Sequence, residues 1–307
     1  IFRKLLSLIM GMNVNTLTDV NEKLQLDIKI APTQKTTILI RNQTGLKTIY
    51  ELVSKSLVEY YGNGKPRIPK SLLEKKKKNI LISSSPTIGF NDSGELVSMY
   101  IRGIDKDEIE ESAKFYDYIQ LMPVSCYEAD IKMKEITDEN YVIEMNKYFY
   151  ELGEKLGKKV VAVGNVMYMY EYERKAKSVL QLANKEFKSF KYPTNNYFRT
   201  TEMMLDEFSY FPQKIREGIV IKNTNDIADM IDRVRPIPEG FYPPIIEGAN
   251  EEVESMTYKK AHELYGEDLP ELIKSRIEKE LNSIIGNGFA VLYLIAQKLV
   301  KKSVENG

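Results

Sequence analysis

Short apolar runs alternate with amphipathic stretches between about residue 36 and residue 188. Short runs rich in β-branched and aliphatic residues are typical of buried strands. Such runs cover residues 36–41, 80–83, 118–122 and 159–166. Between them, apolar residues at helical spacing predict helices over residues 45–60, 108–116 and 139–156. This alternation predicts right-handed crossovers and an α/β fold, as an open sheet or a barrel.

Beyond residue 192 the pattern of apolar positions becomes helical. Helices are predicted over residues 201–208, 223–233, 250–265, 269–285 and 289–302. Asn250 is predicted to cap the third of these, because asparagine and the acidic residues that follow it both favour a helix start. A proline-rich stretch, residues 235–244, predicts an extended connector. The change in pattern places a domain boundary near residues 185–198.

Charge and cysteine content restrict the class of protein. Lys plus Arg and Asp plus Glu number 44 each, so the 307-residue chain has no basic excess that would suit a clamp around nucleic acid. The single cysteine, Cys126, excludes an internal disulfide and fits the cytoplasm, which is the predicted location. No apolar run approaches the roughly 20 residues that span a bilayer. Because the chain begins with Ile1 and not Met, we expect a piece of a longer protein.

Six collinear motifs resemble one bacterial family. They cover residues 42–47, 66–73, 114–118, 198–209, 247–252 and 276–303. In this order and at these spacings they resemble the PolC-type alpha subunit of replicative DNA polymerase III. The resemblance implies a partial, distorted βα barrel of the PHP type, followed by a mainly helical entry to the palm. It assigns residues 1–26 to the tail of a preceding exonuclease domain, 27–190 to the C-terminal half of the PHP domain, and 191–307 to the start of the palm.

The sequence departs from the metal-ligand pattern of that family. Intact PHP domains hold a cluster of metal ions, and the family's ligand pairs fall here on Gln120 with Met122 and on Asn165 with Met167. Residues i and i+2 of a strand share a face, so each pair would converge on one pocket. Divalent ions prefer carboxylate or imidazole ligands, whereas these positions offer neutral amides and thioethers. We therefore predict that the PHP-like domain binds no metal.

Two groups of residues allow both a functional and a purely structural interpretation. The last predicted helix carries three lysines along one face: Lys298, Lys301 and Lys302. They could contact the phosphates of DNA or a nucleotide, or act only as solubilising charge. Three tyrosines follow the predicted strand at 159–166: Tyr168, Tyr170 and Tyr172. They could stack on bases or cap the end of a βα unit. The only histidine, His262, is predicted to lie on a helix surface.

The leading hypothesis is a fragment of a DNA-directed DNA polymerase. The PHP half would then be structural, and the resemblance places the catalytic carboxylates of the palm outside this chain. We expect no catalytic residue and no bound cofactor in the segment, with Mg²⁺ serving the parent polymerase. The implied partners are DNA, dNTP, the rest of the polymerase chain, and a sliding clamp with other replisome proteins, but no membrane. Two alternatives stay open: a PHP-type metal-dependent phosphoesterase or pyrophosphatase, and a stand-alone inactive interaction module.

Overall fold

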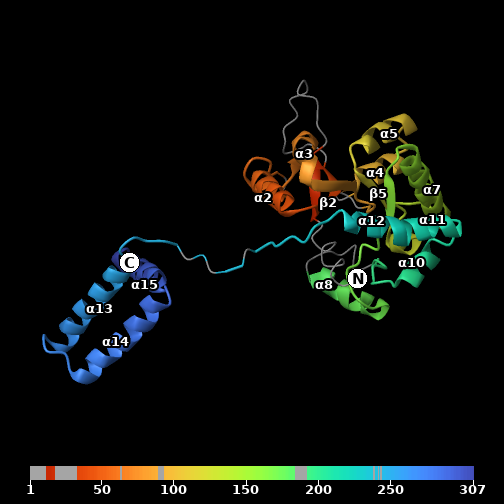
Figure 1. Cartoon of the computed structure of the whole chain (residues 1–307). Helices are drawn as coiled ribbons and strands as arrows, with labels where there is room; N and C mark the ends of the chain where they lie inside the picture. The colour runs from red at the N-terminus through yellow and green to blue at the C-terminus, as the bar shows by residue number, and fades with distance from the viewer. Residues whose placement is uncertain are drawn as a thin grey trace. The chain divides into compact units, whose positions relative to one another are not determined.

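The protein forms two compact units, Ile1–Pro236 (unit 1) and Ile237–Gly307 (unit 2), which Figure 1 shows in a computed structural model. The structure describes residues 12–17, 33–62, 64–88, 93–183, 192–237, 239–240, 242 and 244–307. Most of the predicted linker, residues 1–26, lies outside the described residues. Its described part, Met12–Leu17, forms strand β1 and pairs within the sheet of unit 1.

Unit 1 contains two small sheets. The first has the order β3-β1-β2-β4, and its other strands are β2 (Thr33–Ile40), β3 (Ile68–Pro69) and β4 (Ile80–Ser84). β2 runs antiparallel to both β1 and β4, while β1 and β3 are parallel. In the second sheet β5 (Tyr118–Leu121) pairs in parallel with β6 (Lys159–Ala162). The predicted α/β class is confirmed, but the mixed pairing does not confirm a partial barrel.

Both faces of the central strands are buried. Asp117 connects the two sheets, because its amide donates to the Ile82 carbonyl and its carboxylate accepts from the Ile82 amide, both at 2.7 Å. Alternate residues of the strands then pack into two cores. The larger core holds Ile38, Ile40, Ile80, Ile82, Ile119, Leu121, Val160 and Ala162. The smaller core holds Leu39, Leu81, Tyr118 and Val161, covered by Ile227. This burial on both sides explains the continuous apolar runs in the sequence.

Helices surround these strands (Figure 1). The helices of unit 1 are α2 (Gln43–Val58), α3 (Lys70–Lys76), α4 (Glu95–Ile101), α5 (Lys106–Lys114), α6 (Glu128–Lys132), α7 (Glu139–Lys155), α8 (Arg174–Ala183), α10 (Thr201–Glu207), α11 (Gln213–Glu217) and α12 (Asn223–Asp229). Short 3₁₀ turns cover Lys77–Asn79, Val124–Tyr127 and Glu171–Glu173, and a π-helical turn, Gly218–Lys222, joins α11 to α12. The structure thus contains several short helices that periodicity did not predict.

The Asn-x-Thr-Gly motif starts α2, and two of its residues have physical roles. The Asn42 side chain caps the helix by accepting from the Gly45 amide at 3.0 Å. A Cβ atom at Gly45 would lie 2.2 Å from the backbone oxygen of Asn79, so this site requires glycine. The motif therefore allows α2 to begin directly against the turn before β4.

Unit 1 extends beyond the predicted boundary at 190/191. α12 packs on β6 through Ile227, and Asn223 Nδ2 donates to the Val160 carbonyl at 2.8 Å. The Lys159 ammonium also lies 2.6 Å from the Asp226 carboxylate. The compact unit ends only at Pro236, because these contacts join the first helices after residue 191 to the strands.

Unit 2 folds as α13 (Ala249–Tyr265), α14 (Glu271–Gly286) and α15 (Ala290–Glu305). Its small core consists of Ala249, Val253, Leu281, Ala290 and Leu294. All three helices were predicted, but the expected cap at Asn250 is wrong. Gly248, in a left-handed conformation, precedes the helix and Asn250 lies inside its first turn. Glycine adopts that conformation without a steric penalty, which accounts for the earlier start.

Candidate functional site

The carboxyl ends of β5 and β6 lie at one edge of their sheet, because the two strands are parallel. Two loops continue from this edge, one after Leu121 and one after Ala162. Both predicted ligand pairs belong to these strand ends. The edge is therefore the place where a PHP-type metal cluster would have to be held.

The two residues of the first pair, Gln120 and Met122, lie in different environments: Gln120 makes hydrogen bonds, whereas Met122 is packed in the core. Gln120 Nε2 donates to the Tyr118 hydroxyl at 3.2 Å, and Gln120 Oε1 accepts from Thr37 Oγ1 at 3.4 Å. Met122 lies beyond the end of β5 and is packed in the larger core, with 3% of its surface exposed. The prediction that the two side chains converge on one pocket assumed that the strand continues through Met122. The strand ends at Leu121, so strand alternation does not place Met122.

The second pair, Asn165 and Met167, lies in the loop after β6. The predicted strand to residue 166 ends at Ala162, and Asn165 has a left-handed backbone with φ of 44°. Asn196 holds this loop, because its Nδ2 donates to the Asn165 carbonyl at 3.0 Å and its carbonyl accepts from the Met167 amide at 2.8 Å. The Met167 side chain is 57% exposed. This pair is therefore positioned by a loop and not by strand alternation.

The donor groups at this edge do not fit a divalent metal cluster. An amide oxygen carries no charge to offset that of the ion, and a thioether suits soft ions such as Cu(I). Within the ranges that the structure describes, no group of three or more His, Cys, Asp or Glu residues could hold a metal ion. Near this edge, the end of β4 and the residues after it make structural hydrogen bonds. Ser84 Oγ accepts from the Leu96 amide at 3.2 Å, and the Pro86 carbonyl accepts from the Tyr127 hydroxyl at 2.5 Å.

An ion pair between the buried Arg199 and the partly exposed Glu207 lies beside this edge. The Arg199 side chain is only 1% exposed, and its Nε donates to Glu207 Oε1 at 2.8 Å. A terminal guanidinium nitrogen donates to Ser125 Oγ at 2.8 Å and to the Asn195 carbonyl at 3.0 Å. The Ser125 hydroxyl in turn donates to Glu207 at 2.5 Å. The pair thus joins the turn after β5 to α10. No sequence pattern indicated a role for Ser125.

Cys126 lies next to this ion pair and is chemically protected. The thiol is 3.7 Å from the Gly164 carbonyl and 3.6 Å from the Asn195 carbonyl. Burial raises the pKa of Cys126 to about 11, against a lowering effect of Arg199. Since the thiolate is the nucleophilic form, this cysteine is suited to packing and not to catalysis.

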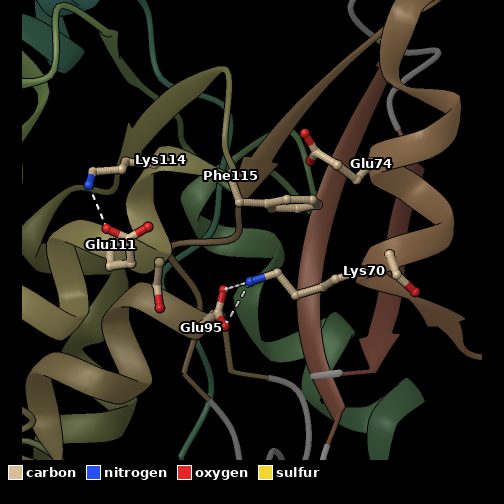
Figure 2. A pocket seen from close by; sticks show the side chains of 8 residues that line it. Lys70, Glu74, Glu95, Glu111, Lys114 and Phe115 are labelled. Atoms are coloured by element: carbon tan, nitrogen blue, oxygen red, sulfur yellow. Dashed lines mark hydrogen bonds and ion pairs between the residues drawn. The ribbon is translucent and has the colours of Figure 1, made fainter. Parts of the chain in front are cut away.

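A second polar cluster lines an open cavity of about 570 Å³ between α3, α4 and α5 (Figure 2). The Lys70 ammonium lies 2.8 and 3.0 Å from the two Glu95 carboxylate oxygens, and the Tyr116 hydroxyl donates to Glu95 at 2.7 Å. Burial, followed by the Glu95 charge, raises the pKa of Tyr116 well above its ordinary value. Lys70 also lies 4.6 Å from the ring centre of Phe115. The charges are satisfied within the protein, so the cluster joins α3 to α4.

In unit 2, two of the three predicted phosphate-contacting lysines have carboxylate partners. The Lys298 ammonium is 3.0 Å from Glu252, and that of Lys301 is 4.0 Å from Glu305. Lys302 is exposed near the end of α15. These surface pairs exchange readily with solvent and leave the lysines available to a stronger anion. His262 is exposed on α13, as predicted, with its Nδ1 3.0 Å from the Gly266 carbonyl.

Comparison with known proteins places this chain in a class. Residues 2–122 match the PHP domain, and residues 251–307 match the bacterial DNA polymerase III alpha NTPase domain. The PHP match includes β1 and most of the stretch that was predicted to be a linker. The two matches occur in this order along the chain.

Relatives that match the chain over nearly all of its length are DNA polymerases III of the PolC type. DNA polymerase III PolC-type from Clostridium perfringens is 39% identical over 298 residues, covering 96% of this chain and 20% of the relative. The proteins of the same name from Caldanaerobacter subterraneus and Staphylococcus haemolyticus are each 39% identical and cover 100% of this chain, with 22% and 21% of their own lengths matched. The chain is homologous to one region of PolC-type DNA polymerase III and spans about a fifth of these relatives.

Within the described parts of the chain, no single helix is long and apolar enough to cross a bilayer. α14 and α15 reach the required length and composition only as a pair, which is bent by 108°.

Proposed function

We propose that this chain is a structural segment of a replicative DNA polymerase. Unit 1 would be a degenerate, metal-free PHP domain that braces the polymerase, and unit 2 would open the palm domain. The catalytic carboxylates of the palm would lie outside this chain. Homology across the whole chain supports the polymerase origin. The chemistry of the strand ends supports the loss of the metal centre.

The observation that carries this proposal is the replacement of ligands by packing at the ends of β5 and β6. Met122, which stands at a ligand position of the family, is a core residue. The charged groups beside it, Arg199 and Glu207, are bonded to each other and to Ser125. A site of this kind contributes rigidity, because a hydrogen-bonded network around a buried arginine favours one arrangement.

The partners follow from the same proposal. DNA and dNTP would be bound by the parent polymerase, whose reaction uses Mg²⁺ held by carboxylates elsewhere. In unit 2, Lys298, Lys301 and Lys302 would contact phosphates near the start of the palm. The remaining polymerase chain, a sliding clamp and other replisome proteins are the expected macromolecular partners, in the cytoplasm.

Two assays on the purified 307-residue chain test this function. With primed template, dNTP and Mg²⁺, we expect no nucleotide incorporation. With Mn²⁺ and a chromogenic phosphate ester or pyrophosphate, we expect no hydrolysis above a matched Met122→Ala/Gln120→Ala variant. Metal-dependent hydrolysis that the variant lacks would contradict the proposal and favour a PHP-type phosphoesterase.

The polymerase origin is tested separately by the mass of the native protein. We expect antibodies against this chain to isolate from its source a protein well above 35.4 kDa that carries primer-extension activity. A native protein of 35.4 kDa without that activity would favour a stand-alone interaction module.

A further inference from the structure

Two tyrosine rings stack on each other at the surface just before α8. The ring centres of Tyr170 and Tyr172 are 5.3 Å apart and the ring planes are inclined by only 7°. The two residues are 56% and 76% exposed, so a ring face remains open to solvent. Tyrosine is enriched at binding surfaces, because its ring is apolar and its hydroxyl is polar.

The backbone below these rings is held firmly. Glu173 accepts hydrogen bonds from the Met169 and Tyr170 amides, both at 2.9 Å. The Tyr168 hydroxyl donates to the Thr194 carbonyl at 2.7 Å, and the Tyr168 carbonyl accepts from the Phe198 amide at 3.0 Å. Of the three tyrosines, Tyr168 therefore has the structural role that was the alternative to base stacking. Because the segment is preorganised, a ligand would lose little free energy in ordering it.

Charges of both signs lie beside the rings, and the cations gather at the start of α8. α8 begins with Arg174, Lys175 and Lys177 and contains no carboxylate. Arg174 pairs with Glu128 at 2.7 Å, and Lys177 donates to Thr194 Oγ1 at 2.9 Å. Lys175 is exposed. Two carboxylates lie nearby. Glu173 accepts hydrogen bonds from backbone amides, and Glu171 is an exposed negative charge.

We propose that Tyr170, Tyr172 and Lys175 form a stacking site for single-stranded DNA. Bases stack on exposed aromatic rings whatever their sequence, and a nearby lysine attracts the phosphate backbone. The parallel, preorganised rings and the cationic start of α8 carry the proposal. The choice of DNA as the nucleic acid rests on the proposed function; the other parts of the proposal do not.

Fluorescence anisotropy of a short labelled oligo-dT strand tests this site on the full 307-residue chain at low salt. Stacking of a single base is worth about fivefold or more in affinity, so Tyr170→Ala/Tyr172→Ala should weaken binding at least about fivefold. Tyr170→Phe/Tyr172→Phe should retain binding, because the ring and not the hydroxyl stacks. The matched control is Tyr61→Ala/Tyr242→Ala, which removes rings of similar exposure, 51% and 75%, and should leave binding unchanged.

Three results would overturn the proposal. They are no binding by the unaltered chain, equal binding by the Tyr170→Ala/Tyr172→Ala variant, and equal loss in the control variant. Sedimentation velocity adds a further arm. If the alanine variant dissociates an oligomer without changing DNA affinity, the rings form a protein interface instead. None of these outcomes alters the metal, primer-extension or mass tests, so failure here is distinguishable from failure of the proposed function.

Discussion

The strand-end region of unit 1 and the helices of unit 2 differ in how completely they pack. Unit 1 buries both faces of its central strands and encloses the Arg199–Glu207 ion pair. Unit 2 buries five residues in its core, two of which are alanines. Large apolar side chains such as Leu272 (79% exposed) and Val304 (77% exposed) remain at its surface. Unit 1 is thus the more completely packed of the two units.

The two units therefore differ in packing, and the strand ends of unit 1 belong to the better packed region. Met122, which the resemblance assigns to a ligand position, contributes its side chain to the core. In unit 2, which matches the polymerase domain, the helices leave much apolar surface exposed. The following substitutions test whether stability is concentrated in unit 1 as this comparison implies.

The largest effect is expected from Arg199→Met, which leaves the Glu207 carboxylate without its cation. Removing one partner of a buried ion pair costs about 3–5 kcal/mol of unfolding free energy, and because Glu207 is 19% exposed we expect a loss near the lower end of this range. Urea denaturation should show this loss, and hydrogen exchange should locate it in unit 1. Arg199→Met/Glu207→Leu should recover most of the loss. The matched control, Arg276→Ala, breaks an exposed pair with Glu280 and should cost less than about 1 kcal/mol.

In unit 2, Leu294→Ala should unfold the helices without affecting unit 1. Leu294 is fully buried, and truncation of such a residue costs about 2–5 kcal/mol. A core of this size supplies only about 3–5 kcal/mol in total. Hydrogen exchange should therefore show lost protection across α13–α15 only. Leu299→Ala, at an exposed position of α15, serves as the control; unchanged protection in the Leu294→Ala variant would refute the small-core interpretation.

Gly45→Ala should destabilise unit 1 by about 1–3 kcal/mol, because the new methyl group meets the Asn79 backbone oxygen at 2.2 Å. Gly218→Ala is the matched control. A Cβ there has no atom within 4 Å, so its effect on the unfolding free energy should be neutral or slightly favourable. Thermal denaturation of both variants measures this difference. An unchanged stability of the Gly45→Ala protein would show that the turn at Asn79 can move to accommodate the methyl group.

A smaller effect concerns pH. Burial, with a contribution from Glu135, raises the pKa of Asp130 to about 7. The folded state therefore binds a proton more tightly than the unfolded chain between about pH 4 and pH 7, and stability should fall as pH rises through this window. Asp130→Asn should remove this slope and be more stable than the unaltered protein at pH 8. Parallel urea titrations at pH 5 and pH 8 measure it; an identical slope in the variant would assign it to another group.

The sequence predicted the helices and strands whose apolar residues follow a regular spacing. β4, β5 and α7 were recovered because their apolar positions are continuous or helically spaced. α4 was missed because it has only seven residues, too few to show a clear helical period. β6 was overextended, since the apolar pattern continues through a turn that Asn165 makes in a left-handed conformation.

The candidate site was only partly predictable for a similar reason. The positions of Gln120 and Asn165 near the ends of β5 and β6 followed from the family pattern. The bond from Arg199 to Ser125 joins residues 74 positions apart, so no local pattern could indicate it. The stacking of Tyr170 on Tyr172 depends on the turn at Glu171–Glu173, whose geometry the sequence did not specify.

Metal stoichiometry tests the central claim most directly. The 307-residue chain would be equilibrated with Mn²⁺ or Zn²⁺, separated from unbound ions and assayed for metal by mass spectrometry. We predict substoichiometric metal that is unchanged in a Gln120→Ala/Asn165→Ala variant. One or more ions per chain, lost in that variant, would contradict the account and show that the strand ends of unit 1 still form a metal centre.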